Sequence, residues 1–384
     1  MEGQEDLTGA QSQHALIPIA EPVLGDRETE YVLDALRSGW VSSAGPYLER
    51  FEKGFAQYVG VPHAIAVSSG TAALHLILHS LNIGSGDEVI VPDLTFAATA
   101  HAVLQTGASP VFVDVDPESW CMDPSVTRRA ISDRTMAIVP VHLYGQPADT
   151  VGLGVLAAKH RISLIEDAAE ALGGRVGNAM VGSFGRASAF SFYGNKIVTT
   201  GEGGMVTTSD DELAERLRFL KDQGMSKLKR YYHTELAFNY RMTNLQAALG
   251  VAQMEQAEAL VEAKREIRRW YGEELDGVEG IVLNKEVSNT RNVFWMTSIV
   301  LTDATSERRD AIADRMRAGG VDTRPFFVPM SQLPHLASYR QVGASADRCE
   351  VALSLASRGL NLPSGCGLSR GQVAHVASVL KQCL

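Results

Sequence analysis

The sequence predicts an α/β fold, in which a mostly parallel central sheet is followed by a smaller C-terminal α+β domain. Over the first 255 or so residues, short apolar runs alternate with helix-length segments, as in parallel sheets buried on both faces. A long charged helix predicted over 254–275 then ends this pattern. Because 384 residues exceed what one hydrophobic core usually holds, we predict a flexible tail (1–16), a large domain (17–255) and a small domain (256–384).

The expected elements follow from where apolar runs and breakers fall along the chain. In the large domain, strands are predicted at 64–67, 88–91, 111–115, 136–141, 163–165, 187–192 and 205–208. Helices are predicted between them at 71–81, 96–105, 151–159 and 211–219. In the small domain, we expect strands at 281–283 and 295–301 and a helix at 307–318. Ligands of parallel sheets bind beyond the carboxyl ends of the strands, so residues just after these strands are the first site candidates.

The composition excludes several classes of protein. A hydrophobic content of 45% with 21% charged residues is ordinary for a globular protein. The net charge of −10 argues against a protein that coats nucleic acid or an anionic membrane. No apolar run approaches the roughly 20 residues of a membrane helix, and residues 1–16 lack the pattern of a secretory signal. With four scattered cysteines, we expect a cytoplasmic protein.

The most informative residue is Lys196, which ends the run 191–196 and precedes the glycine-rich stretch 199–204. An unperturbed lysine has a pKa of about 10.4 and is a poor nucleophile at neutral pH. A partly desolvated lysine, by contrast, forms Schiff bases. The alternative is a solvated surface lysine, but the position beyond a strand and before a flexible glycine turn favours the reactive one.

Two further features also follow predicted strands. Asp167 comes after the apolar stretch 162–166 and could keep a pyridine nitrogen protonated, although a helix N-cap is the alternative. The turn 68–71 precedes an apolar helix, whose N-terminus favours a phosphate, or serves as plain capping. A reactive amine, a carboxylate for a ring nitrogen and a phosphate cradle are what pyridoxal phosphate (PLP) requires of a protein. Together they predict a PLP enzyme.

Two smaller candidates carry less information. Phe96 follows a predicted strand and could stack on a flat ring, although a phenylalanine at a strand end often belongs to the core. His75 and His79 have the i, i+4 spacing of a metal pair on a helix. Because no third ligand accompanies them, we predict ordinary packing and no metal site.

At this point the residues resemble the PLP-dependent sugar aminotransferases of the DegT/StrS type. Proteins of this type have the aspartate aminotransferase-like fold known as fold type I. The resemblance runs from about residue 18 to the C-terminus. It rests on five motifs, at 69–76, 142–145, 166–170, 191–196 and 239–244.

The resemblance implies a role for each matching position. Lys196 would hold PLP covalently and act as the catalytic residue. Asn239 would reach the cofactor phosphate of a neighbouring subunit, which implies a homodimer with shared active sites. Glu170 would face the phenolic oxygen of the cofactor, where many relatives have Gln or His. The positions expected to contact the cofactor are Ser69, Gly70, Thr71, Phe96, Asp167, Glu170, Ser191 and Asn239.

The resemblance also implies a transaminase that uses glutamate and a nucleotide-diphosphate keto sugar. Several stretches are most similar to the branch that aminates GDP-4-keto-6-deoxymannose, and we expect substrate contacts from Tyr47, Arg230 and Arg324. The alternatives are a 3-keto GDP sugar, a dTDP- or UDP-4-keto sugar, a cyclitol ketone, or a non-catalytic PLP-binding regulator. A PLP sugar dehydratase is disfavoured, because relatives of that kind carry His where this chain has Lys196.

Overall fold

The computed structural model describes residues 16–384, so all but the last residue of the tail predicted at 1–16 lies outside the described part. Eight strands form the central sheet in the order β1-β9-β8-β5-β4-β2-β3-β14. β9 is antiparallel to both of its neighbours, and every other pairing is parallel. The strands are β1 (His63–Val67), β2 (Glu88–Pro92), β3 (Ser109–Val113), β4 (Thr135–Ile138), β5 (Ser163–Asp167), β8 (Ala187–Ser191), β9 (Gly204–Thr208) and β14 (Gln341–Val342).

The α/β class and the mostly parallel sheet are therefore confirmed, and each strand predicted in the first part of the chain lies on a strand of this sheet. The predicted run 136–141 is longer than β4, because Val139 and Val141 are buried without continuing its ladder. Val141 instead forms a single parallel bridge with Asp167, the last residue of β5. The two-residue β14 was missed because it has too few residues to show a pattern.

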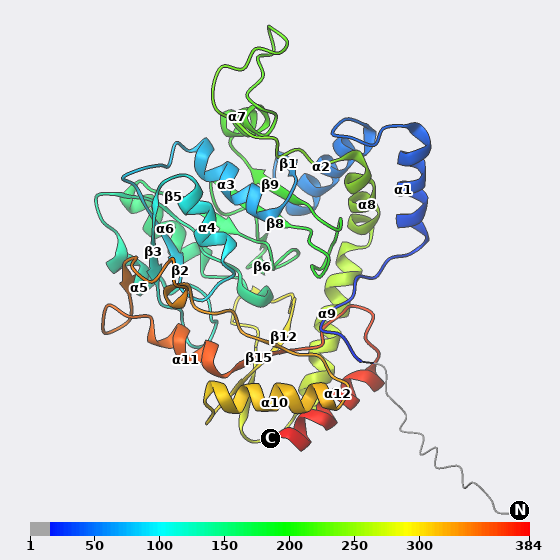
Figure 1. Ribbon diagram of the computed structural model, residues 1–384, viewed down its shortest axis with the longest axis vertical. Helices are drawn as coiled ribbons and strands as arrows, with labels where there is room; N and C mark the ends of the chain where they lie inside the picture. Colours follow the sequence, from blue (N-terminus) through cyan, green and yellow to red (C-terminus); the bar gives the residue numbers. More distant parts are fainter. Residues whose placement is uncertain (1–15) are drawn as a thin grey trace, which may run out of the picture.

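Helices pack around the central sheet. Figure 1 shows α1, α2 and α8 grouped along one flank, where α8 contacts both of the others. These three helices were not predicted from the sequence, although Thr243 and Gln246 form a capping box at the start of α8. The helices are α1 (Asp26–Ser38), α2 (Pro46–Val59), α3 (Gly70–Ser80), α4 (Ala98–Gln105), α5 (Pro124–Ala130), α6 (Thr150–His160), α7 (Asp211–Lys221) and α8 (Asn244–Glu255).

The C-terminal part has a sheet of its own, in the order β10-β12-β15-β13. Its apolar core includes Tyr271, Ile299, Leu360 and Leu380, and Ile17 from the start of the described chain joins it. Figure 1 shows α9 running from the central sheet towards α10 and α12. The elements are α9 (Ala257–Glu274), β10 (Ile281–Leu283), β12 (Thr297–Leu301), α10 (Ser306–Ala318), β13 (Arg324–Pro325), α11 (Glu350–Arg358), β15 (Gly359–Leu362) and α12 (Arg370–Cys383).

A third, small sheet joins the two parts. It pairs β6 (Arg175–Val176) with both β7 (Ala179–Met180) and β11 (Thr290–Arg291). The predicted boundary at 255/256 coincides with the break between α8 and α9, and it stays a prediction. Within residues 16–384, no helix has the length and apolar character needed to cross a membrane.

Candidate active site

A cavity of about 450 Å³ lies beyond the carboxyl ends of β1, β5 and β8. Parallel strands end at one edge of a sheet, so residues far apart in the sequence meet here. The C-terminal part closes the cavity with Trp295, Met296 and the segment around β13. The predicted site residues that line the cavity are Ser69, Gly70, Thr71, Phe96, Asp167, Glu170, Ser191, Lys196 and Arg324.

The side chain of Lys196 ends inside this cavity and retains only 14% exposure. Its Nζ lies 3.7 Å from Oε1 of Glu170 and 3.8 Å from the ring centroid of Trp295. Burial lowers the pKa of Lys196, while the carboxylates of Glu170 and Asp167 oppose that shift. A lysine with a lowered pKa has a larger fraction of free amine at neutral pH, which is the form that acts as a nucleophile or a base.

Glu170 is buried beside Lys196, and its Oε2 accepts a hydrogen bond of 2.8 Å from the backbone N–H of Tyr144. Burial raises the pKa of Glu170 to about 7, although the Lys196 ammonium and the Tyr144 N–H favour the ionised form. The carboxyl group therefore changes its protonation in the neutral range. The Glu170 carboxyl can therefore either carry a proton or be ionised next to the Lys196 amine.

Asp167 ends β5 and is also buried. Its Oδ2 accepts a hydrogen bond of 2.8 Å from Thr99, and its Oδ1 accepts one of 3.2 Å from the N–H of Ala169. Burial raises the pKa of Asp167, and the Thr99 hydrogen bond, the largest opposing effect, lowers it. A buried carboxylate is costly without a cation beside it, so a protonated ring nitrogen is a fitting partner.

The turn before α3 supplies an anion cradle. Ser69 caps the helix by accepting a hydrogen bond of 3.1 Å from Ala72, which leaves the N–H groups of Gly70 and Thr71 in the first turn without intrahelical acceptors. A side chain at Gly70 would come within 2.9 Å of the Ser191 Cβ, so only glycine brings this turn so close to the end of β8. The amine, the carboxylate and this turn together fit PLP.

Phe96 and Arg324 lie at the rim of the cavity, and both are exposed. The Phe96 ring lies 5.6 Å from the ring of Phe327, so one aromatic wall is formed by both parts of the chain. Arg324 belongs to the two-residue strand β13, which pairs with β15. Its guanidinium is a suitable partner for a phosphate or carboxylate.

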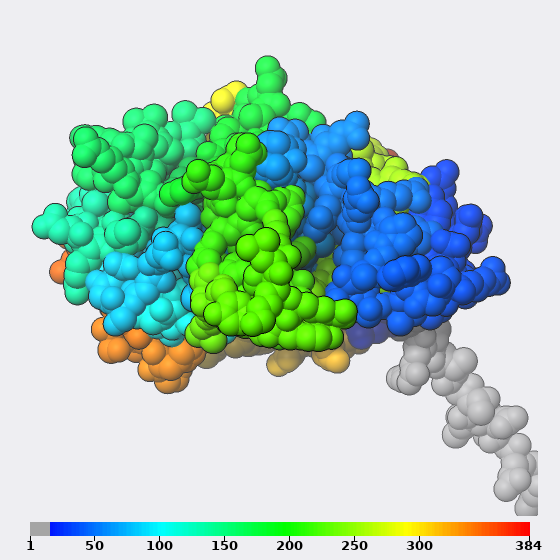
Figure 2. Space-filling model, turned by 90° about the horizontal axis from the view of Figure 1, so that it is seen from above, coloured from blue at the N-terminus to red at the C-terminus, as the bar shows by residue number. Residues whose placement is uncertain are grey.

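The three remaining predicted residues do not line the cavity of this single chain. Tyr47 is buried at the start of α2, where its hydroxyl donates a hydrogen bond of 2.9 Å to Asp34. Arg230 is exposed and stacks over Tyr231, and the exposed Asn239 accepts a hydrogen bond from Arg241. Both belong to the segment 222–243, part of which extends beyond α7 in Figure 1 and lies toward the viewer in Figure 2, whereas Asn239 forms a bridge with Asp222 at the end of α7. Their roles stay predictions.

Comparison with known proteins agrees with this geometry. Residues 22–381 match the model of the DegT/DnrJ/EryC1/StrS aminotransferase family. The chain belongs to this family.

Relatives and solved structures of similar length are found in several bacteria. A GDP-perosamine synthase of Caulobacter vibrioides is 43% identical over 96% of this chain and 98% of the relative. One of Vibrio cholerae is 42% identical over 95% of this chain and 98% of the relative. A Streptococcus pneumoniae protein solved in a PMP form superimposes with a TM-score of 0.90 at 27% identity, covering 96% of this chain and 97% of that one.

Several residues of this DegT-family site had no role predicted from the sequence. Thr99 binds Asp167, Tyr144 binds Glu170 and Trp295 contacts Lys196, yet none of the three is near its partner in the sequence. Tyr144 lies in the family motif 142–145, and Trp295 lies in the stretch 294–296, one of those most similar to the branch that aminates GDP-4-keto-6-deoxymannose. These similarities were the only signals available. Their contacts depend on how β4, β5 and the C-terminal part meet.

The close approach of two backbones beside the cavity gives a test of this packing. A side chain at Gly204 would lie 2.5 Å from the backbone carbon of Ser69, whereas one at Gly194 would meet no atom within 4 Å. We expect Gly204→Ala to lower the free energy of unfolding by about 1–3 kcal/mol. Gly194→Ala, the matched control on the other side of Lys196, should change it by less than about 0.5 kcal/mol. Equal effects in urea denaturation would contradict the described packing.

Proposed function

We propose that this protein is a PLP-dependent aminotransferase that moves the amino group of glutamate to GDP-4-keto-6-deoxymannose, giving GDP-perosamine. The observation that carries the proposal is its similarity to three GDP-perosamine synthases, each 41–43% identical over 95–96% of this chain. The cavity supports it with a buried amine, a buried carboxylate and an anion cradle at one sheet edge. Glutamate and a keto sugar nucleotide are its substrates, and we keep a cytoplasmic location as a prediction.

When bound, PLP supplies an electron sink that stabilises negative charge on the carbon that carries the amino group. In this proposal Lys196 Nζ takes the proton from Cα of glutamate, and it returns a proton to the sugar carbon that receives the amine. Its lowered pKa suits the first task, because a larger fraction of the amine is then free to accept a proton. Trp295, Phe96 and Phe327 line the cavity around the amine.

The other residues bind and orient. Asp167 would hold the ring nitrogen in its protonated form, and Phe96 would pack against the ring. The turn formed by Ser69, Gly70 and Thr71, together with Ser191, would bind the phosphate. The exposed guanidinium groups of Arg324 and Arg230 suit the diphosphate of the sugar nucleotide, and Tyr47 contributes a substrate contact.

A homodimer with shared sites is part of the proposal. Asn239 is exposed and lies outside the cavity of its own chain. The segment 222–243 projects in part beyond α7 (Figure 1), as a segment that completes a neighbouring site would, and Asn239 lies at its base, where it forms a bridge with Asp222. In the dimer Asn239 binds the cofactor phosphate of the partner subunit.

A panel of keto sugar nucleotides tests the substrate. With glutamate as donor, we expect the GDP-4-keto-6-deoxy sugar to be aminated faster than GDP-3-keto, dTDP-4-keto and UDP-keto sugars, with the product identified by mass and NMR. The UDP-3-keto sugar is the sharpest competitor, because a UDP-N-acetyl-3-dehydro-α-D-glucosamine 3-aminotransferase of Acidithiobacillus ferrooxidans is 40% identical over 85% of this chain. Preference for that substrate would replace the GDP sugar in the proposal.

Lys196→Ala is the control for this panel. General acid–base catalysis contributes at least ~100-fold, so the variant should lose at least that factor with every substrate while still binding the cofactor. Activity within about tenfold of the wild type would refute proton transfer by Lys196. A protein that binds PLP but is not converted by glutamate would instead be the non-catalytic regulator.

The protonation of Glu170 is tested with the visible absorbance band of the cofactor. In the proposed arrangement the Glu170 carboxyl faces the phenolic oxygen, and its pKa is about 7. Raising the pH through 7 ionises Glu170, which then repels a phenolate and favours a proton on that oxygen. We expect a spectral transition near pH 7 in the wild type that is lost or moved in Glu170→Gln. The same dependence of absorbance on pH in the wild type and in Glu170→Gln would contradict this role of Glu170.

The shared site is tested by mixing two inactive chains. In a mixed dimer of Lys196→Ala and Asn239→Ala chains, a site built from both subunits carries either both changes or neither. Each mixed dimer should therefore have about half of the wild-type activity, and a random mixture, in which about half of the dimers are mixed, should recover about a quarter. If Lys196 and Asn239 served the same chain, each site would keep one lesion and mixing would restore nothing.

A further inference from the structure

Trp295 is packed directly against the reactive amine. The face of its indole lies 3.8 Å from Lys196 Nζ, and its Nε1–H donates a hydrogen bond of 2.8 Å to the carbonyl of Asn195. The indole also packs against Tyr144, whose ring is stacked at 6.3 Å between centroids. With only 4% exposure, Trp295 has little freedom to move. It contacts both the side chain and the backbone of the lysine segment.

The backbone that presents Trp295 is strained. Phe294 has a φ of 48°, in the left-handed region that a bulky residue rarely adopts. The backbone nitrogens of Phe294 and Trp295 pass so close to Gly145 that a side chain there would lie 2.6–2.7 Å from them. Such strain persists only where the surroundings hold it, and it clusters at functional sites.

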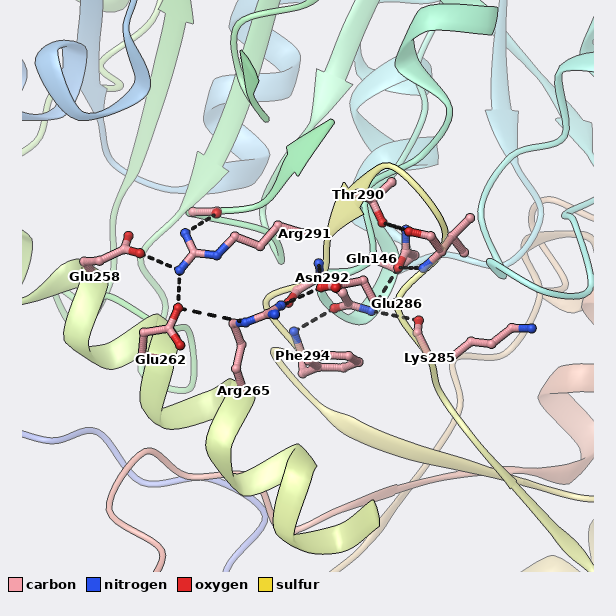
Figure 3. Close-up of polar contacts among 12 residues, drawn as sticks. Gln146, Glu258, Glu262, Arg265, Lys285, Glu286, Thr290, Arg291, Asn292 and Phe294 are labelled. Atoms are coloured by element: carbon pink, nitrogen blue, oxygen red, sulfur yellow. Dashed lines mark hydrogen bonds and ion pairs between the residues drawn. The ribbon is translucent and has the colours of Figure 1, made fainter. Parts of the chain in front are cut away.

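A polar network holds this strained segment in place (Figure 3). Asn292 accepts a hydrogen bond of 2.7 Å from the N–H of Phe294 and donates one of 3.1 Å to Gln146. Glu286 accepts a hydrogen bond of 2.8 Å from the N–H of Asn292 and pairs with Arg265 on α9. The network therefore anchors the segment both to the turn after Tyr144 and to α9.

A buried lysine, Lys264, holds the backbone carbonyl of Trp295. Lys264 on α9 is 2% exposed, and its Nζ donates hydrogen bonds to the carbonyls of Trp295, at 3.0 Å, and of Ser364. Burying an ammonium that binds only carbonyls is costly, and burial accordingly lowers the pKa of Lys264. The chain thus tolerates backbone strain at Phe294 and a buried cation at Lys264, and both features hold Trp295 in its position.

We propose that Trp295 is a positioning residue for Lys196. Each time Lys196 accepts a proton, the face of the Trp295 indole holds and stabilises the resulting ammonium. Cation–π attraction favours the charged form of the Lys196 amine, as do the carboxylates of Glu170 and Asp167. Burial and the ammonium of Lys264 favour the neutral form. The indole keeps the charged amine beside the reacting atoms instead of releasing it to water. This role rests on the proposed function of Lys196.

The titration of Lys196 tests the proposal directly. In the enzyme carrying pyridoxamine phosphate, Lys196 is a free amine, so the 13C NMR signal of its Cε reports its pKa and is assigned by its absence in Lys196→Arg. We expect Trp295→Leu to lower this pKa by about one unit. Trp295→Phe, which keeps an aromatic face but loses the Asn195 hydrogen bond, should lower it less. An unchanged or raised pKa in Trp295→Leu would overturn the proposal.

The supporting network is tested with a substitution that changes no charge. Asn292→Ala should lower the pKa of Lys196 by less than Trp295→Leu does, and it should cause no further change when combined with Trp295→Leu. The exposed Asn178 provides the matched control, since Asn178→Ala should leave the titration unmoved. Additive shifts in the double variant would contradict a role through Trp295.

These outcomes are separate from those of the proposed function. Pyridoxamine phosphate can be added directly, so the titration does not require turnover of glutamate or of a sugar nucleotide. If wild-type enzyme fails to aminate any keto sugar while the titration series behaves as expected, the function fails and the role of Trp295 stands. If wild-type enzyme aminates the GDP sugar and the pKa of Lys196 does not fall in Trp295→Leu, the proposed function stands and the role of Trp295 fails.

Discussion

The arrangement of the site depends on the buried carboxylate of Glu166. It receives hydrogen bonds from the N–H groups of three residues that follow β7 and from Ser188 on β8, and it contacts the ring of His142 at 3.1 Å. These contacts join β5, β8 and the turn after β4. Successive side chains of a strand point to opposite faces, so anchoring Glu166 on one face places Asp167 on the other, where the cavity lies. The residues that contribute these N–H groups are Gly182, Phe184 and Gly185.

Around Asp167 the cavity brings several buried ionisable groups together. Two carboxyl groups with raised pKa values face a lysine with a lowered one, so none of the three is held firmly in its ordinary charge state. Such opposed shifts in one cleft are typical of sites that transfer protons. A ligand with a cationic ring and an anionic phosphate complements this set, since each charge meets an opposite charge or an N–H group.

The site also depends on the meeting of the two parts of the chain. The central sheet supplies the amine, the carboxylate and the anion cradle, while Trp295, Arg324 and Phe327 come from the C-terminal part. Tyr144 links them, because its N–H binds Glu170 and its hydroxyl accepts a hydrogen bond of 3.1 Å from the N–H of Phe327. A displacement of the C-terminal part would therefore change the surroundings of Glu170 and Lys196 together.

The sequence alone determined the strands of the central sheet and the placement of Lys196, Asp167 and the turn at Ser69, because apolar runs, breakers and strand ends are local signals. Only the tertiary structure decided which neighbours tune them. Thr99, Tyr144 and Trp295 reach the cavity through contacts between distant segments, which no local pattern encodes. Glu166 and Asp167 are adjacent carboxylates on β5, and only the fold shows which of them points to the face that holds the cavity. The single chain places Asn239 and Arg230 outside the cavity, as the proposal of a site shared between two subunits requires.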